Sequence, residues 1–259
     1  MTFDQEVHDR IQFSRNALKV VVAQVRFPIN YRLSEAGVLP ALQEALLADY
    51  PIALPRGEQI TVAVGPGGPS ITAPKQGPTQ FANAARTSTV TIGEDMAGFE
   101  TTAYTDWPSF LASFENVLRL LDSHFRPAGV DRLGLRFVDE IPSDGSRTIG
   151  DWARLVGPSL LGAEDSPARD PRIVGTIQHV VIDMGEGDTI NLRHGYSRIE
   201  GQPGPESVYL LDTDASVQNV PWDIDDLLAR AGRYHAWAWN LFIRSLTEGG
   251  RDVLGRAEG

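Results

Sequence analysis

Apolar and polar positions along the chain follow two periods, one typical of strands and one typical of helices. A β-branched run over residues 17–27 predicts an opening strand that ends at Pro28. Apolar residues spaced three and four apart over 106–125 predict an amphipathic helix, with Asp106 as its cap and Pro108 in its first turn. Between these elements the patterns predict a helix over 34–50, strands over 60–64, 81–92 and 99–104, and a loop or weak hairpin over 65–79.

The second half of the chain repeats this order of elements. The patterns predict strands over 132–138, 173–184, 189–197 and 207–213, a short helix over 149–156 and a long closing helix over 223–247. Arg136-Phe137 ends its opening strand as Arg26-Phe27 ends the first, and Trp222 precedes the second long helix as Trp107 begins the first. Because the order and the offsets nearly agree, the sequence predicts an internal duplication with halves at 1–127 and 128–259.

The expected fold class is therefore α+β. Each half is predicted to be a β-α-β-β-β-α unit, in which an antiparallel sheet carries helices on one face, and the two halves are expected to form one continuous structural unit. This order of elements is that of the TATA-binding-protein-like architecture. A shared order of elements does not transfer function, so the function has to come from particular residues.

Charge and composition exclude several classes of protein. The 259 residues include 23 Lys and Arg against 34 Asp and Glu, a formal net charge of -11, and most of the excess lies in residues 131–259. Nucleic acid and anionic membranes both attract basic surfaces, so both are disfavoured as partners. The chain has no cysteine, which removes disulfides and thiolate sites. A polar N-terminal segment and the lack of long apolar runs predict a cytoplasmic protein.

The usual motifs of catalytic and cofactor sites do not occur in the sequence. The five histidines show no HExxH or HxH spacing, and no GxSxG is present. The glycine-rich stretch over 65–69 contains prolines where a phosphate-binding loop needs amides. Asp223, Asp225 and Asp226 suit the N-terminal end of the closing helix. We therefore expect no metal and no cofactor, and a non-enzymatic protein rather than an enzyme.

Arginines on the two opening strands form the first candidate site. By strand alternation Arg132 and Arg136 point to one face, while the apolar residues between them point to the other, and Arg26 stands at the corresponding place in the first half. These arginines could bind a small anionic ligand or a partner's acidic side chain. They could instead pair internally with Asp139 and Glu140, and this pairing is favoured.

Aromatic residues in the closing helix indicate a protein partner. Trp237 and Trp239 are two residues apart and cannot share one helix face, so we expect one in the core and the other at an interface. Asp212 and Asp214, expected at a strand end near the surface, would add charge to the same recognition surface. The main hypothesis is a cytoplasmic binding or regulatory protein that engages another macromolecule, with homo-oligomers possible. The alternative is an anion-binding protein or enzyme that uses Arg26, Arg132 and Arg136.

Several phrases together resemble a sporadically distributed bacterial family of about this length to which no function is assigned. They are Asn16-Ala17-Leu18-Lys19 before Val25-Arg26-Phe27-Pro28, Thr101-Thr102-Ala103-Tyr104 before Trp107-Pro108, and Arg132-Leu133-Gly134-Leu135-Arg136-Phe137. Phe137 and Asp139 stand where the resemblance implies tyrosine and asparagine. Patchy distribution is common among mobile defence and toxin–antitoxin genes, so the resemblance implies an antitoxin-like or defence-associated accessory role.

Overall fold

A computed structural model describes residues 13–255, except 36, 56–57, 60–61, 66–67, 72–74, 147, 162–169, 171 and 200–205. Its strands are β1 (Leu18–Arg26), β2 (Ile52–Leu54), β3 (Glu58–Gln59), β4 (Val62–Gly65), β5 (Gly68–Ile71), β6 (Lys75–Gln76), β7 (Thr79–Ala82), β8 (Ser88–Gly93), β9 (Met96–Thr101), β10 (Val130–Pro142), β11 (Gln178–Gly185), β12 (Asp188–Ile199) and β13 (Glu206–Val220). The α-helices are α1 (Val38–Leu46), α2 (Trp107–Phe125), α3 (Pro158–Leu161), α4 (Ile224–Ser245) and α5 (Glu248–Leu254), and the 3-10 helices are η1 (Tyr31–Ser34) and η2 (Asp151–Arg154).

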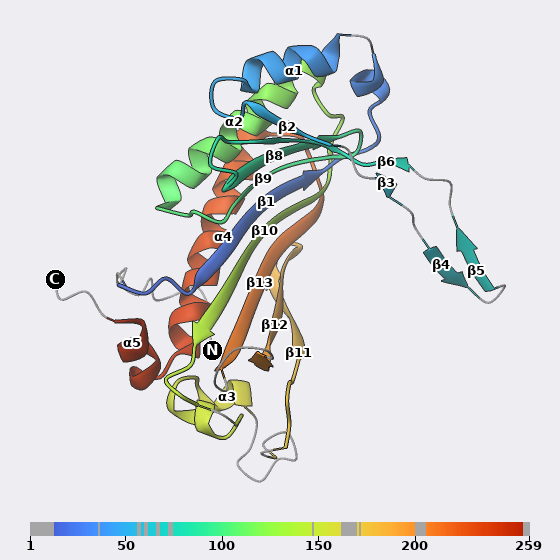
Figure 1. The fold of residues 1–259 in the computed structure, drawn as a ribbon. Coiled ribbons are helices and arrows are strands. Elements are labelled where there is room, and N and C mark those ends of the chain that lie inside the picture. The colour runs from blue at the N-terminus through green and yellow to red at the C-terminus, as the bar shows by residue number, and fades with distance from the viewer. Residues whose placement is uncertain are drawn as a thin grey trace. The chain divides into compact units, whose positions relative to one another are not determined.

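The fold class is α+β, which confirms the expectation from the sequence. In the described part of the chain, nine strands form one open antiparallel sheet in the order β11-β12-β13-β10-β1-β9-β8-β7-β2, with helices packed on it (Figure 1). No helix among the described residues is long and apolar enough to cross a membrane. Strands β11 and β2 are the two edges of this sheet.

The chain divides into two compact units, and each is described by itself. Unit 1 comprises the described residues of Met1–Val21, Gly134–Val217 and Leu228–Gly259, and unit 2 those of Val22–Leu133 and Gln218–Leu227. These bounds differ from the sequence halves 1–127 and 128–259, because β1 and β10 each contribute to both units.

Helix α2 forms the core of unit 2. The Asp106 side chain accepts a hydrogen bond from the Ser109 amide at 2.8 Å, so the predicted cap is confirmed. The buried stripe of the helix consists of Phe110, Phe114, Val117, Leu118, Leu121 and Phe125. Phe110 meets Phe99 of β9 with ring centroids 5.2 Å apart. The period of the sequence thus places this stripe on the covered face of the sheet.

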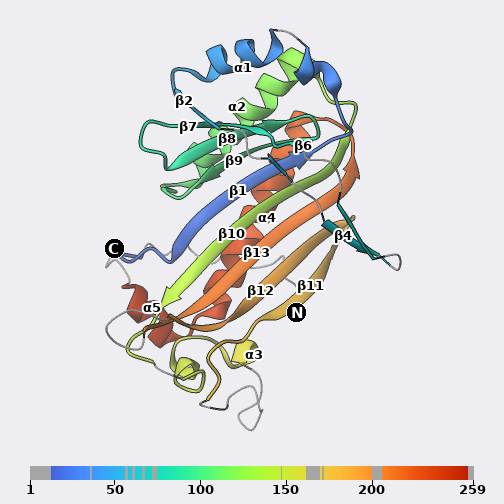
Figure 2. The same ribbon diagram turned by 45° about the vertical axis from the view of Figure 1, so that its right-hand side comes forward.

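Helix α4 is fixed in unit 1 by an apolar contact and a buried ion pair. His235 packs on Phe137 of β10 with ring centroids 5.9 Å apart. The carboxylate of Asp188, at the start of β12, accepts hydrogen bonds from Tyr234 Oη at 2.5 Å and Arg230 Nη1 at 2.8 Å. Figure 2 shows α4 lying along one side of β10 and β13. The helix therefore holds β12 as well as β10.

Two expected elements are shorter than predicted. The strand over 81–92 is a hairpin of β7 and β8, because the Asn83 side chain accepts hydrogen bonds from the amides of Thr87 and Ser88 and closes a turn. The helix over 149–156 is reduced to the four residues of η2. Its continuation is prevented because Val156 instead forms a bridge with Leu246.

Other strands begin or end at different places. Strand β13 runs to Val220 rather than to 213, and β10 covers 130–142 rather than 132–138. The strand expected from 173 becomes regular only at Gln178. A Cβ on Gly195 would lie 1.8 Å from the carbonyl oxygen of Thr176, so the chain bends closely over this glycine. Residues 62–64 of the expected strand belong to β4, which pairs with β5, so the hairpin begins before the predicted range 65–79. Residues 60–61 of that strand lie outside the described residues.

Replacing Phe114 with alanine should strongly destabilise the protein. The ring is fully buried in the middle of the α2 stripe, and its removal should cost about 3–5 kcal/mol in the free energy of unfolding. Urea unfolding followed by circular dichroism measures this cost. Asn116→Ala, at an exposed site on the same helix, is the control and should change stability by less than about 0.5 kcal/mol. A loss below about 1 kcal/mol for Phe114→Ala would contradict the packing.

Candidate functional site

Two of the candidate residues bind each other. Arg136 of β10 makes a bidentate pair with Asp212 of β13, in which Nε donates to Oδ1 at 2.7 Å and Nη2 donates to Oδ2 at 2.8 Å. The side chain of Asp212 is 7% exposed and that of Arg136 is 46% exposed. The expectation that Asp212 lies at a strand end near the surface is therefore wrong. It is wrong because β13 continues well beyond this residue.

The expected partners of Arg136 lie elsewhere. Asp139 is buried on the covered face of β10, opposite the face that carries Arg136. Glu140 pairs with Lys19 of β1 at 3.7 Å. The alternation predicted for β10 is confirmed, because Leu135 is buried between the half-buried Arg132 and the exposed Arg136.

The three candidate arginines do not lie in one unit. Arg26 ends β1 with an exposed side chain whose Nε donates to Gln24 Oε1 at 3.4 Å. Arg26 and Arg132 belong to unit 2, whereas Arg136 belongs to unit 1. The guanidinium fork of Arg136 is occupied by Asp212, so an anionic ligand would have to displace a buried carboxylate there.

The two tryptophans of α4 differ in burial, as helix geometry requires. Trp237 is 7% exposed and stacks on Tyr234 with centroids 5.4 Å apart. Trp239 is half-buried and packs against Phe242 at 6.0 Å, and Phe242 in turn meets Phe13 at 6.1 Å. Trp237 is thus a core residue. Asp214, like Trp239, is half-buried.

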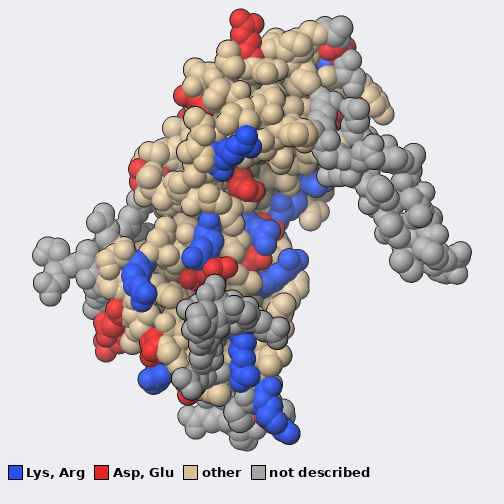
Figure 3. Space-filling model, viewed as in Figure 1, with Lys and Arg blue, Asp and Glu red and all other residues tan. Residues whose placement is uncertain are grey.

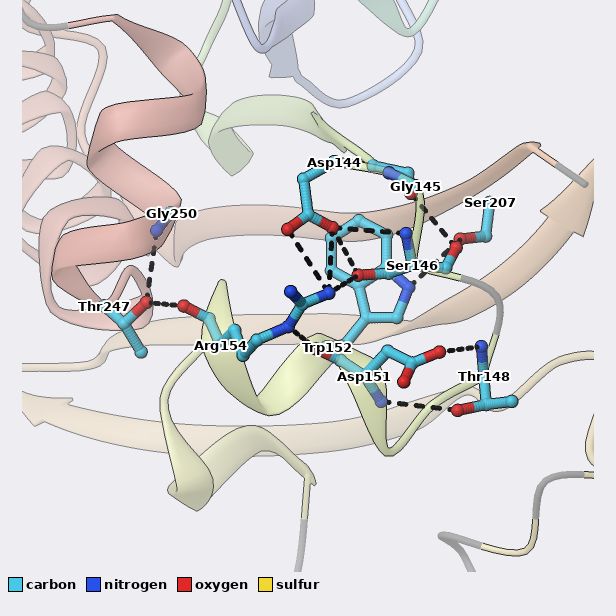
Figure 4. A network of polar contacts seen from close by, with 11 residues as sticks. Asp144, Gly145, Ser146, Thr148, Asp151, Trp152, Arg154, Ser207, Thr247 and Gly250 are labelled. Atoms are coloured by element: carbon cyan, nitrogen blue, oxygen red, sulfur yellow. Dashed lines mark hydrogen bonds and ion pairs between the residues drawn. The ribbon is translucent and has the colours of Figure 1, made fainter.

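The side chains of a polar network near η2 hydrogen-bond to one another and to the backbone (Figure 4). The Asp144 carboxylate accepts from Ser146 Oγ at 2.5 Å and pairs with Arg154 at 3.3 Å. Trp152 Nε1 donates to Ser207 Oγ at 3.1 Å, and Ser207 Oγ donates to the Ser146 carbonyl at 2.7 Å. The hydroxyl of Ser146 therefore donates its proton to a carboxylate, and no histidine is among the residues labelled in Figure 4. The arrangement is that of a braced turn rather than of an activated nucleophile.

A cavity of about 430 Å³ lies in unit 2 beside α1, α2 and the strands β8 and β9. Its polar lining includes Asp49, Tyr50, Ser113 and Asn116, and no Lys or Arg. Burial raises the pKa of the Tyr50 hydroxyl, the Ser113 hydrogen bond lowers it, and the charge of Asp49 raises it again. An anionic ligand would therefore find no charge complement in this cavity.

Charged side chains are mixed on the face of the molecule seen in Figure 3. Lys and Arg side chains lie next to Asp and Glu side chains, without a broad area of one sign.

The most unusual surface of unit 1 is its edge strand, which sequence reasoning missed. Large apolar side chains are exposed along β11 and the segment before it: Val174 (61%), Ile177 (81%), Val180 (42%) and Val181 (60%). β11 pairs with β12 on one side and is an end strand of the sheet. A cluster of exposed apolar residues on a monomer commonly marks a binding surface.

The side of β11 away from β12, with which no described strand pairs, has a defined row of backbone groups. Thr176 N donates to the Tyr196 carbonyl at 2.8 Å and Arg198 N donates to the Val174 carbonyl at 2.9 Å. Even-numbered residues therefore turn their backbone groups toward β12, and the register runs without a shift from 178 to 183. By antiparallel alternation, the amides and carbonyls of His179, Val181 and Asp183 point away from the sheet.

Comparison with known proteins identifies no family. No family model matches the chain, and no curated protein matches it. Six chains among the solved structures match. One is the di-domain ARO/CYC StfQ from the steffimycin biosynthetic pathway, at 8% identity over 91% of this chain and 96% of that one, with a TM-score of 0.20. A TM-score this low carries no argument about fold or function.

Removing either member of the Arg136–Asp212 pair should destabilise the protein, by unequal amounts. Asp212→Ala loses the charged hydrogen bonds, which should cost about 1–3 kcal/mol. Arg136→Ala should cost more, because it leaves the buried carboxylate without its cation, whereas an exposed arginine left alone can be hydrated. Urea unfolding of both variants gives the two values. An Arg136→Ala variant of unchanged stability would contradict a structural role for this pair. It would support Arg136 as a ligand-binding residue.

Asp139 should make stability depend on pH. Burial raises the pKa of its carboxyl from 3.8 to about 7, and none of the described residues donates a hydrogen bond to it. Between these two values the unfolded chain is ionised while the folded chain keeps the proton, so stability falls as pH rises and then levels off above about pH 7.

Asp139→Asn keeps the shape of the side chain without the charge. It should raise the melting temperature at about pH 8 far more than at about pH 4. Glu140→Gln, at the exposed neighbouring position, is the control and should show no such difference. Equal effects of Asp139→Asn at both pH values would mean that the carboxyl is ionised throughout.

Proposed function

We propose that this protein is a non-enzymatic binding protein that engages another polypeptide chain by strand addition at β11. The observation that carries the proposal is the free edge of β11, where exposed apolar side chains flank outward amides and carbonyls. In strand addition the backbone of an edge strand supplies the affinity, and alternate side chains supply the specificity.

The sequence of β11 lacks two of the usual protections of an edge strand. Natural edges commonly carry lysine, proline or an inward charge that prevents pairing with a second strand. The run Gln178-His179-Val180-Val181-Ile182-Asp183 has neither lysine nor proline, and its three central residues are β-branched. This composition favours pairing of β11 with a second strand at its outer edge.

The proposal changes which residues carry recognition. Asp212 and Trp237 are buried within unit 1, which disfavours a direct role in partner binding. Asp214 and Trp239 are half-buried and are secondary candidates. The edge residues Val180 and Val181 replace them as the main contact.

The proposed architecture includes an internal duplication of the β-α-β-β-β-α unit. Its support is the strand order, because β11-β12-β13-β10 from one edge has its counterpart in β7-β8-β9-β1 from the other, with β2 as an addition. Each group also ends with a long helix, α4 or α2. In such a duplicated sheet the strand that corresponds to β11 is β7, which is covered by β2.

Val181→Pro tests the binding function. Proline removes the outward amide of Val181 but no hydrogen bond to β12, so the fold should survive while strand addition is lost. The tagged protein is used as bait in an extract of the cells that encode it, and bound chains are identified by mass spectrometry. Val181→Thr, which keeps the amide and the β-branch, should retain what the unaltered bait retains.

The melting temperature of each bait, followed by circular dichroism, verifies that it is folded. A chain captured equally by Val181→Pro and by the unaltered bait does not bind at this edge. If every reproducibly captured chain behaves in this way, the proposed function fails.

A further inference from the structure

The outward backbone groups of β11 restrict how a second strand can pair with it. Within the regular part of β11, from 178 to 183, the residues that present amides and carbonyls to the outer side are His179, Val181 and Asp183. If the added strand is another copy of β11 in antiparallel orientation, odd residues must therefore meet odd residues. This leaves a few symmetric registers, which differ by two residues.

One of these registers is complementary in charge. When the twofold axis passes through Val181, His179 lies opposite Asp183 of the second copy, and Asp183 lies opposite His179 of the second copy. Shifting the register by two residues either way instead places His179 opposite valine or glycine, and Asp183 opposite isoleucine or valine. An imidazole directly across an antiparallel pair from a carboxylate donates a hydrogen bond to it, and adds an ion pair when the imidazole is protonated.

The apolar residues are complementary in the same register. Val181 meets its own counterpart at the axis, and Val180 meets Ile182 on the other face of the sheet. The two Val180–Ile182 pairs lie between hydrogen-bonded pairs. Their Cα atoms are therefore closer together than those of the hydrogen-bonded pairs. Val180 is 42% exposed and Val181 is 60% exposed in the single chain, so pairing would cover apolar surface that now contacts water.

We propose that β11 pairs with β11 of a second copy of this chain, antiparallel and centred on Val181. This inference rests on the proposed function, that β11 accepts an added strand, and it names the strand. A contact of this kind is isologous, since the same surface serves both copies, and it closes at two chains. The opposite edge strand, β2, has three residues and offers no comparable length of edge.

Analytical ultracentrifugation of the purified full chain at micromolar concentrations tests the inference. The unaltered chain and Val181→Thr should sediment as a dimer, whereas Val181→Pro should sediment as a monomer. His179→Asp places two acidic residues opposite each other at both ends of the contact and should weaken the dimer by about tenfold or more. His179→Asp combined with Asp183→Lys exchanges the two charges and should restore it.

The outcomes distinguish a failure of self-pairing from a failure of the proposed strand addition. A monomeric unaltered chain overturns self-pairing, and edge-dependent capture of a different protein would then still support strand addition. A dimer that persists in Val181→Pro also overturns self-pairing, because the contact must lie on another surface. A dimer lost in His179→Asp but not recovered in the double variant overturns the register centred on Val181. Recovery in the double variant supports that register.

Discussion

An open antiparallel sheet satisfies the backbone groups of its inner strands but leaves a row of amides and carbonyls at each edge. Both edges of this sheet face the same constraint and differ in length, with three residues in β2 and eight in β11. An edge of three residues can form few backbone hydrogen bonds with a second strand. The proposed strand addition therefore rests on the long edge of β11.

The strands beside β11 are held in unit 1 by polar contacts of their own. Asp188 begins β12 and is held from α4 by Tyr234 and Arg230. On the next strand, Asp212 neutralises Arg136 and ties β13 to β10. The first contact holds β12 and the second holds its neighbour β13, and β11 is paired with β12 without a shift in register from 178 to 183. A preorganised edge loses little conformational entropy when a strand is added.

Local patterns were sufficient to predict the fold class, α2 and the alternation of β10. The cap at Asp106 and the spacing of Phe110 and Phe114 are properties of neighbouring residues. The pairing of Arg136 with Asp212 was not predictable in this way, because it depends on which strand lies beside β10. The exposure of Val181 could not be predicted for the same reason. A Val-Val-Ile run is as typical of an inner strand as of an edge strand.

The net charge of -11 opposes the approach of any two copies of this chain. Most of that charge lies away from β11, and charges farther apart than a Debye length, about 8 Å at physiological ionic strength, are largely screened. Within Gln178–Met184 the ionisable residues are His179 and Asp183 alone, so the edge itself carries little of the net charge. A basic partner would be attracted to the protein as a whole but would find one carboxylate per β11 to bind. A second β11 meets the repulsion over the whole surface, and in the proposed contact two His179–Asp183 pairs oppose that repulsion.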